Sequence, residues 1–569
     1  MGVARSLPAG ALVLFVSAVC VMPPASAAEL IIRNAVVLTM DDTNPKAQAI
    51  AIDGGKIVAI GSNEDMGAHI TAQTKIYDLP GKLVLPGFQD AHNHLVWSAA
   101  ELEDISLFEA ATKEDLAEAI KTGAAERPGE AWVRGSGWDL SAFPDNTLDK
   151  AFLDELVPDR PAYFAAADGH SAWVNSKALE LAGITADTKD PEGGRIERDA
   201  TGAPQGLLRE AATALVSEKM PAYSAVQVAR GLKKALAEAN SYGITAIIDP
   251  KAEEWMLDGY KAALDAGTLS VRVSAAVEIK PEQGIGGVEP ILALRERFND
   301  AMLRVNSAKL FVDGVIEAKT AAMLEAYVGG NEAGELLFTP EALAEISGVA
   351  DKAGLQLHYH AIGDRAVRVA LDAVEFAREQ NGPRDGRHQI AHLEVIDPAD
   401  IARFKQLGVL ANFQGLWAYP DSYITDLTEP VIGPERSKWL YPIGAVAQAG
   451  GMIVGGSDWS VSSMNPLEAI QVAVTRQDPE NAEGRVLTPE HKVDVMTMLK
   501  AYTVNAAYAG FREAETGTLS VGKLADIVVL DADVTTIAPA EIATVAVLMT
   551  LLEGKPVFEH ESLPAPVAP

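Results

Sequence analysis

The chain has 569 residues but almost no cysteine. Its single cysteine, Cys20, lies in an apolar run near the N-terminus, so no disulfide can form within the chain. A lipidated Cys20 is the less favoured alternative, because Val19 before it is not the small residue that such a site prefers. At about 100–200 residues per domain the chain is too long for one compact core. A barrel of about 250 residues with one or two extra modules fits the length.

Basic residues are the second shortage. There are 47 lysines and arginines against 79 aspartates and glutamates, which gives a formal net charge of −32. A field of this sign repels phosphate backbones and anionic lipid surfaces, and we therefore expect no nucleic acid and no membrane as partner. A local pocket can differ from the overall field, so the charge says little about the substrate. A small-molecule substrate is the expected partner, and a homodimer remains open.

Long apolar runs are also missing. The run from Ala11 to Met22 is shorter than the ~20 residues that a membrane-spanning helix needs, and no later run is long enough. Arg5 precedes this run, and Ala25-Ser26-Ala27 follows it as a small-x-small cleavage site. These features predict a signal peptide over residues 1–27 and a periplasmic or secreted bacterial protein.

Short β-rich segments occur at both ends of the chain. Near the N-terminus, Asp53-Gly54-Gly55 separates two apolar runs, which is a strong hairpin signal. Residues 510–562 contain short β-rich apolar runs like those in residues 28–82. Neither end has enough strands to bury a core by itself. We therefore predict that the two ends pair into one small β-sandwich.

Between the two ends, apolar β-rich runs alternate with amphipathic helical segments, which is typical of a parallel sheet in an α/β fold. The pattern predicts a (β/α)8 TIM-like barrel from residues 83–95 and 224–509. The count of eight strands requires residues 96–223 to be an insertion after the first strand. This insertion is irregular and rich in Trp, Gly and Asp, which suits a lid over the site. The eight expected strands are Leu83–Phe88, Ile244–Asp249, Val271–Val277, Ala308–Val312, Leu355–His360, His388–His392, Val409–Phe413 and Met452–Gly456.

Histidines and one aspartate follow the ends of these expected strands. His92 and His94 are two apart, so in an extended chain their imidazoles point the same way. His360, His392 and Asp458 each end another strand, at the edge where such barrels place catalytic groups. Four imidazoles and a carboxylate suit Zn²⁺, as one ion or two, with another divalent metal as an alternative.

Three further residues have open roles. His358 shares a strand face with His360 and is a rival ligand. Lys309 lies in an apolar strand; it is either a snorkelling or salt-bridged lysine, or a carbamylated lysine that bridges two metals. His170 belongs to the insertion and is expected to face the cleft. The remaining histidines are interpreted as structural or surface residues: His69, His388, His491 and His560.

Several motifs resemble the amidohydrolase superfamily. The segment from Pro86 to His94 resembles its first metal motif, and Gly517 to Leu530 resembles its returning sandwich strand. Other segments resemble the YtcJ-like branch, which includes N-substituted formamide deformylase. These are Gly135-Ser136-Gly137-Trp138-Asp139, Asp168-Gly169-His170-Ser171-Ala172-Trp173-Val174-Asn175-Ser176, Lys309-Leu310-Phe311-Val312-Asp313-Gly314, His360-Ala361-Ile362-Gly363-Asp364-Arg365-Ala366 and Gly456-Ser457-Asp458-Trp459.

The resemblance implies a metal-dependent hydrolase of a C–N bond in a small amide or N-formyl-type substrate. It implies metal ligands at His92, His94, His360 and His392, with Asp458 as both ligand and proton shuttle. Lys309 matches the position where many relatives carry a carboxylated, bridging lysine. The segment Ile390-Ala391-His392 departs mildly from relatives, which often have an acidic residue before the histidine.

The expected mechanism uses metal-activated water, with Asp458 moving the proton to the leaving nitrogen. Trp138, Asp168 and His170 are the candidate substrate contacts. Two alternatives remain at this point: a lactone or ester hydrolase on the same metal site, and a non-catalytic periplasmic binding or regulatory protein.

Overall fold

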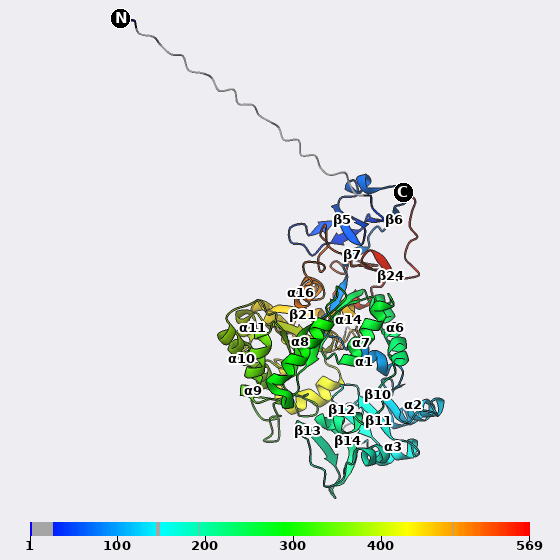
Figure 1. The fold of residues 1–569 in the computed structure, drawn as a ribbon, viewed down its shortest axis with the longest axis vertical. Helices are drawn as coiled ribbons and strands as arrows, with labels where there is room; N and C mark the ends of the chain where they lie inside the picture. Colours follow the sequence, from blue (N-terminus) through cyan, green and yellow to red (C-terminus); the bar gives the residue numbers. More distant parts are fainter. Residues whose placement is uncertain (3–26, 144–147, 192, 482) are drawn as a thin grey trace.

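The computed structural model describes residues 1–2, 27–143, 148–191, 193–481 and 483–569. The expected signal peptide, including Cys20, lies almost entirely outside these described residues. Among the residues described, no helix is both long enough and apolar enough to cross a membrane. Figure 1 shows three parts in a row, with a β-rich part at the top, a barrel in the middle and a mixed α/β part at the bottom.

The upper part is built from both ends of the chain. Strand β22 (Ile527–Leu530) pairs antiparallel with β7 (Leu83–Pro86), and β7 pairs parallel with β2 (Val36–Leu38). The full order in this sheet is β24-β23-β22-β7-β2-β3, with β3 (Lys46–Ala47), β23 (Val547–Leu552) and β24 (Lys555–Glu559). A second sheet has the order β5-β4-β1-β6, with β1 (Leu30–Arg33), β4 (Ala49–Asp53), β5 (Lys56–Gly61) and β6 (Lys75–Asp78).

One apolar core joins these two sheets. It contains Ile32 and Ile50 from the sheet β5-β4-β1-β6. It also contains Val84, Ile527 and Leu548 from the sheet that holds the C-terminal strands. Neither end could exclude water from this core without the other. The prediction of a sandwich made from both chain ends is confirmed.

The middle part is an eight-stranded parallel sheet in the order β21-β20-β19-β18-β17-β16-β15-β8. Its strands are β8 (Phe88–Asp90), β15 (Ile244–Asp249), β16 (Arg272–Glu278), β17 (Leu303–Phe311), β18 (Gln356–Ala361), β19 (Gln389–His392), β20 (Leu410–Phe413) and β21 (Met452–Gly455). Backbone hydrogen bonds from Ala91 N to Gly455 O (2.9 Å) and from Asp458 N to His92 O (2.7 Å) bring the two edge strands together. The predicted TIM-like barrel is confirmed.

The first expected barrel strand, Leu83–Phe88, is wrong as a single element. Its first four residues form β7 of the sandwich, and the barrel strand begins only at Phe88. The chain changes sheets at Gly87, where an added Cβ would lie 2.4 Å from the side chain of Thr245 on β15. Glycine fits this crossing because the Thr245 side chain occupies the space that a Cβ would need.

Helices cover the outside of the barrel. Three of these helices are α6 (Ala225–Ser241), α9 (Pro340–Lys352) and α10 (Asp364–Asn381). Ser224 caps α6 by accepting from Gln227 N, and Thr339 caps α9 by accepting from Ala342 N, which satisfies exposed helix N–H groups. The others around the barrel are α1 (Leu95–Glu101), α7 (Glu254–Asp265), α8 (Val288–Arg297), α11 (Ile401–Leu407), α12 (Glu429–Ser437), α13 (Ile443–Gln448), α14 (Pro466–Thr475), α15 (Val495–Ala501) and α16 (Val504–Ala509).

The lower part lies between β8 and β15 in the chain. It is more regular than the sequence suggested, because it forms a six-stranded sheet with a core of its own around Trp138, Phe164 and Trp173. The strands, in the order β13-β14-β12-β11-β10-β9, are β9 (Ile105–Ser106), β10 (Val133–Trp138), β11 (Ala162–Ala166), β12 (Ser171–Val174), β13 (Gly194–Arg198) and β14 (Pro204–Glu210). Its main helices are α2 (Lys113–Glu126), α3 (Lys150–Leu156) and α4 (Ser176–Ala182).

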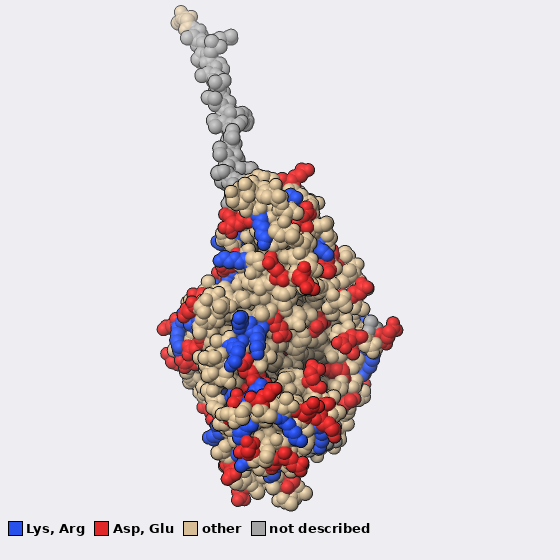
Figure 2. Space-filling view, turned by 90° about the vertical axis from the view of Figure 1, so that its right-hand side faces the viewer, with Lys and Arg blue, Asp and Glu red and all other residues tan. Residues whose placement is uncertain are grey.

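Acidic side chains are spread over the face of the molecule shown in Figure 2, with fewer basic groups between them. This distribution agrees with the formal net charge of −32. On this face the acidic side chains are therefore not confined to one segment of the chain.

Candidate metal centre

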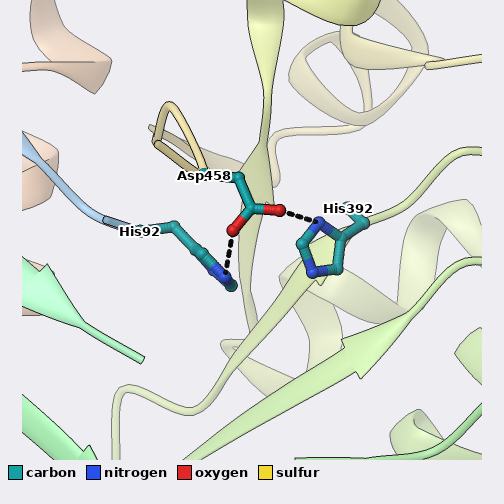
Figure 3. A group of neighbouring side chains, drawn as sticks. All are labelled: His92, His392 and Asp458. Carbon is teal, nitrogen blue, oxygen red and sulfur yellow. Dashed lines mark ion pairs between the residues drawn. The ribbon is translucent and has the colours of Figure 1, made fainter. Parts of the chain in front are cut away.

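Three buried side chains converge at the carboxyl ends of the barrel strands. His92 follows β8, His392 ends β19 and Asp458 follows β21. Each offers one ligand atom, and these atoms all lie within 4.8 Å of one another. Figure 3 shows the Asp458 carboxylate between the two imidazoles, with one oxygen directed at each. The parallel strands bring these residues together because their carboxyl ends meet at the same edge of the sheet.

His94 joins this group from the loop between β8 and α1. Its Nε2 lies 3.1 Å from Asp458 Oδ1, and His92 Nε2 lies 3.3 Å from the same oxygen. On the other side, His392 Nδ1 lies 3.9 Å from Asp458 Oδ2. Ligands about 2.0–2.1 Å from a tetrahedral Zn²⁺ are separated by about 3.3 Å from one another. The contacts of His92 and His94 with Asp458 are close to this separation, and the mutually close atoms of His92, His392 and Asp458 suit one shared divalent ion.

Unsatisfied polar atoms mark the same place. His92 Nε2, His392 Nδ1 and Asp458 Oδ1 are buried and have no hydrogen-bond partner among the residues described. Such atoms are costly to bury unless something satisfies them. A divalent cation would satisfy all three together, so the residues present fit a metal ion.

The protonation states also suit metal binding. Burial, reinforced by the charge of Lys309, lowers the pKa of His92 to about 3. Burial holds the pKa of His392 well below its ordinary value. Burial opposes the ionisation of Asp458, but the surrounding histidines, His92 first, hold its pKa well below its usual range. At neutral pH the group therefore presents neutral imidazoles and an anionic carboxylate, which are the forms that bind metals.

Asp90 holds the two loops of the centre together. Its Oδ1 accepts from the backbone N–H groups of His92 (3.1 Å) and Ser457 (3.0 Å). Its Oδ2 accepts from Asn93 Nδ2 (3.0 Å) and from Ser457 Oγ (2.6 Å). This side chain lies beneath the ligands and ties the end of β8 to the end of β21.

His360 and Lys309 lie beside the group but not in it. The His360 ring is 4.5 Å from the His392 ring, while its Nε2 lies 3.2 Å from the carbonyl oxygen of Gly314. Lys309 is fully buried, and its Nζ has no hydrogen-bond partner in the described part of the chain. Burial lowers the pKa of Lys309 to about 7, although Asp458 opposes this shift. Both residues are thus near the centre, and His360 is not part of the three-residue group.

Two of the three expected substrate contacts reach this region. Asp168 Oδ1 accepts from His170 N (2.8 Å), and the His170 ring lies 5.3 Å from the His360 ring. Burial disfavours a charged His170, but Glu210, whose Oε2 is 2.7 Å from His170 Nδ1, outweighs it and raises the pKa of His170 to about 9. Trp138 is not brought to the centre, because it is 1% exposed in the core of the insertion.

The other histidines are also placed. His358 does not join the metal group, and its Nε2 lies 3.0 Å from His92 Nδ1. His388 Nε2 lies 3.1 Å from Asp351 Oδ1, and His491 Nε2 lies 3.0 Å from the Lys438 carbonyl oxygen.

Sequence reasoning missed several residues around the centre. Asp90 had a signal, since it stands two residues before His92, and Asp313 lies in the segment from Lys309 to Gly314 that carries part of the family resemblance. Asp313 accepts from the backbone N–H groups of Ile362 (3.0 Å) and Gly363 (2.9 Å), which orders the segment after His360. Trp417 had no signal; its ring is stacked on His392 at 5.7 Å with an interplanar angle of 5°.

Comparisons with known proteins identify the family of the chain. A model of the amidohydrolase family matches residues 75–558. Protein LONG AFTER FAR-RED 3 of Arabidopsis thaliana is 30% identical over 560 residues, which cover 94% of this chain and 93% of that protein. N-substituted formamide deformylase of Arthrobacter pascens is 29% identical over 542 residues, which cover 92% of this chain and 97% of that enzyme.

A solved structure is similar as well. The metal-dependent hydrolase of Pyrococcus furiosus is 26% identical, has a TM-score of 0.68, and matches over 89% of this chain and 100% of its own. The family model spans most of the chain, and the relatives match along nearly their whole length. The chain therefore belongs to the amidohydrolase family and is a metal-dependent hydrolase of carbon–nitrogen bonds.

Proposed function

We propose that the chain hydrolyses the C–N bond of a small amide, with N-formyl amines as the first substrate class, at a zinc centre. The observation that carries this proposal is the convergence of three buried ligand atoms, from His92, His392 and Asp458, that have no hydrogen-bond partner within the described chain. The similarity to N-substituted formamide deformylase supports the choice of N-formyl substrates.

His92, His94, His392 and Asp458 would hold the ion. Neutral imidazole nitrogens and a carboxylate oxygen suit Zn²⁺ and similar divalent metals. When bound, such an ion makes water acidic near neutral pH and polarises the substrate carbonyl. Lys309 and His360 would complete a place for a second ion if Lys309 is carboxylated, and the lowered pKa of Lys309, about 7, favours the neutral amine that this modification needs.

Asp458 moves the proton in this proposal. Its carboxylate is anionic at neutral pH, and one oxygen lies within 3.3 Å of both His92 Nε2 and His94 Nε2. A base held at this point accepts a proton from the attacking water and then delivers it to the leaving nitrogen. Positive φ values at Asp458 (56°) and His392 (77°) show that the backbone holds both residues in a conformation that non-glycine residues rarely adopt.

The insertion supplies the groups on the substrate side. Asp168 and His170 contact the substrate in this proposal, with His170 protonated at neutral pH because Glu210 stabilises its charge. A positive N–H group at the mouth of the site can donate to a carbonyl oxygen on which negative charge develops.

Export to the periplasm is part of the same proposal. It rests on the composition of residues 1–27 alone. Cell fractionation and N-terminal sequencing of the protein made in a bacterial host would test it, and a mature chain that begins at Ala28 is the expected result.

The experiment that tests the proposed function combines a metal count with a substrate panel. Protein purified without chelator is analysed for bound zinc, and its hydrolysis of N-formyl amines, other small amides, ureas, lactones and esters is measured. We expect at least one ion per chain, and N-formyl amines or small amides with the highest kcat/KM. A higher kcat/KM for lactones or esters would contradict the proposal. So would a metal-free protein that is as active as the metal-containing protein.

A further inference from the structure

His358 lies next to a metal ligand at the centre of the barrel. It is on β18, where it pairs with Lys309 of β17 and Gln389 of β19. Both His358 and His92 are fully buried, and their rings stand 4.8 Å apart at 71°. The atoms in closest contact are His358 Nε2 and His92 Nδ1, at 3.0 Å. An N···N distance of this length is a hydrogen bond in which one ring donates and the other accepts.

The direction of this hydrogen bond follows from what His92 does with its other nitrogen. His92 Nε2 faces Asp458 Oδ1 at 3.3 Å, so this nitrogen is the one that points to the metal group. A neutral imidazole has one N–H, and a nitrogen that binds a metal cannot carry it. The proton of His92 therefore belongs on Nδ1, and His92 donates it to His358 Nε2.

We propose that His358 is a positioning residue for the metal centre, which accepts from His92 Nδ1 and thereby holds His92 with Nε2 free for the ion. This inference rests on the proposed function, because it needs a metal at His92. It also replaces the role of rival ligand that the strand alternation suggested for His358. His358 Nε2 already accepts from His92, and His358 is not among the residues whose ligand atoms lie within 4.8 Å of one another, so His358 does not act as a ligand.

The orientation of the His92 ring depends on such a partner. It stands at the junction of β8 and β21, where its carbonyl accepts from Asp458 N (2.7 Å). His92 Nε2 and His94 Nε2 both contact Asp458 Oδ1, and a rotation of the His92 ring would move its Nε2 away from this oxygen. Groups that orient a metal-bound histidine are typically worth about 10–100-fold in metal affinity. We expect the His358–His92 contact to contribute within this range.

The first experiment measures zinc affinity by competition with a chromophoric chelator, in the full chain stripped of metal. His358→Leu removes the acceptor, and we expect its zinc Kd to rise by about 10–100-fold. His358→Gln places an amide oxygen near the former Nε2, so we expect its Kd to stay within a few-fold of the wild type. His388→Leu is the matched control, because it removes another buried histidine that contacts Asp351 and not the metal group.

A second comparison keeps the test independent of folding defects. In His358→Asn the new side chain is as polar as in His358→Gln but too short to reach His92. We therefore expect the His358→Asn protein to bind zinc weakly and the His358→Gln protein to bind it with near-native affinity. The visible spectrum of the Co²⁺-loaded protein reports the ligand geometry, and it should change in His358→Asn and be restored in His358→Gln.

Each result decides the inference. Zinc affinity in His358→Asn and His358→Leu within a few-fold of the wild type would overturn it, as would equal losses in His358→Asn and His358→Gln. A wild-type protein that binds no divalent metal would overturn the proposed function together with this inference. A wild-type protein that binds zinc but is insensitive to His358 would overturn the inference alone.

Discussion

Asp90 offers the sharpest test of how the site is held together. Its Oδ1 accepts from the buried backbone N–H groups of His92 (3.1 Å) and Ser457 (3.0 Å). Asp90→Ala leaves both N–H groups without a partner, at about 1–3 kcal/mol for each buried group. The two loops are therefore destabilised by about 2–6 kcal/mol together. At about 1.4 kcal/mol per factor of ten, the local opening of these loops should become at least ~30-fold more frequent.

Hydrogen exchange read by mass spectrometry measures this opening directly. In metal-free Asp90→Ala, we expect amide exchange in residues 88–94 and 455–460 to accelerate by at least ~30-fold. Asp90→Asn keeps one oxygen for the two N–H groups and should show a much smaller effect. Residues 351–357, at the other end of the barrel, serve as the internal control. Exchange in the two loops within threefold of the wild type would refute the assigned role of Asp90.

Three further predictions follow from the same site. Asp458→Asn keeps the side-chain shape but removes the base, so kcat/KM for a cleaved N-formyl substrate should fall by about 10²–10⁴-fold with metal still bound, and survival within a few-fold would exclude Asp458 as the shuttle. The pKa of His170 is raised to about 9 from 6.5, so its stabilising contribution is complete below pH 6.5 and is lost as the pH rises through 9. The Tm difference between wild type and His170→Gln should accordingly shrink from about pH 6 to about pH 9.5, and a constant difference would contradict the His170–Glu210 pair. Removal of metal with a chelator should lower the Tm, and added Zn²⁺ should restore it in proportion to the logarithm of its concentration; an unchanged Tm would show that the ion is not bound by the folded state.

The convergence of three side chains could be predicted from the sequence because each of them ends or follows a strand. His92, His392 and Asp458 follow apolar runs, and the carboxyl ends of parallel strands necessarily meet at one rim. The family resemblance then assigned roles that the spacing alone left open, such as that of Lys309.

Other features depended on contacts that no local pattern encodes. The apolar run Leu83–Phe88 gives no sign that the chain changes sheets at Gly87, which is set by the approach of Thr245. Alternation along β18 places His358 and His360 on one face, but only the pairing with neighbouring strands shows that His358 reaches His92. Trp138 lies in a Gly-rich motif that suggested a substrate contact, yet its N–H donates to Phe164 O within the insertion core (2.9 Å).

The most direct test of the central claim is an anomalous difference map, collected at the zinc edge, from crystals of the protein grown with Zn²⁺. The account predicts a peak about 2.0–2.2 Å from His92 Nε2, His94 Nε2, His392 Nδ1 and an oxygen of Asp458. A map in which His92, His392 and Asp458 share no anomalous peak would contradict it.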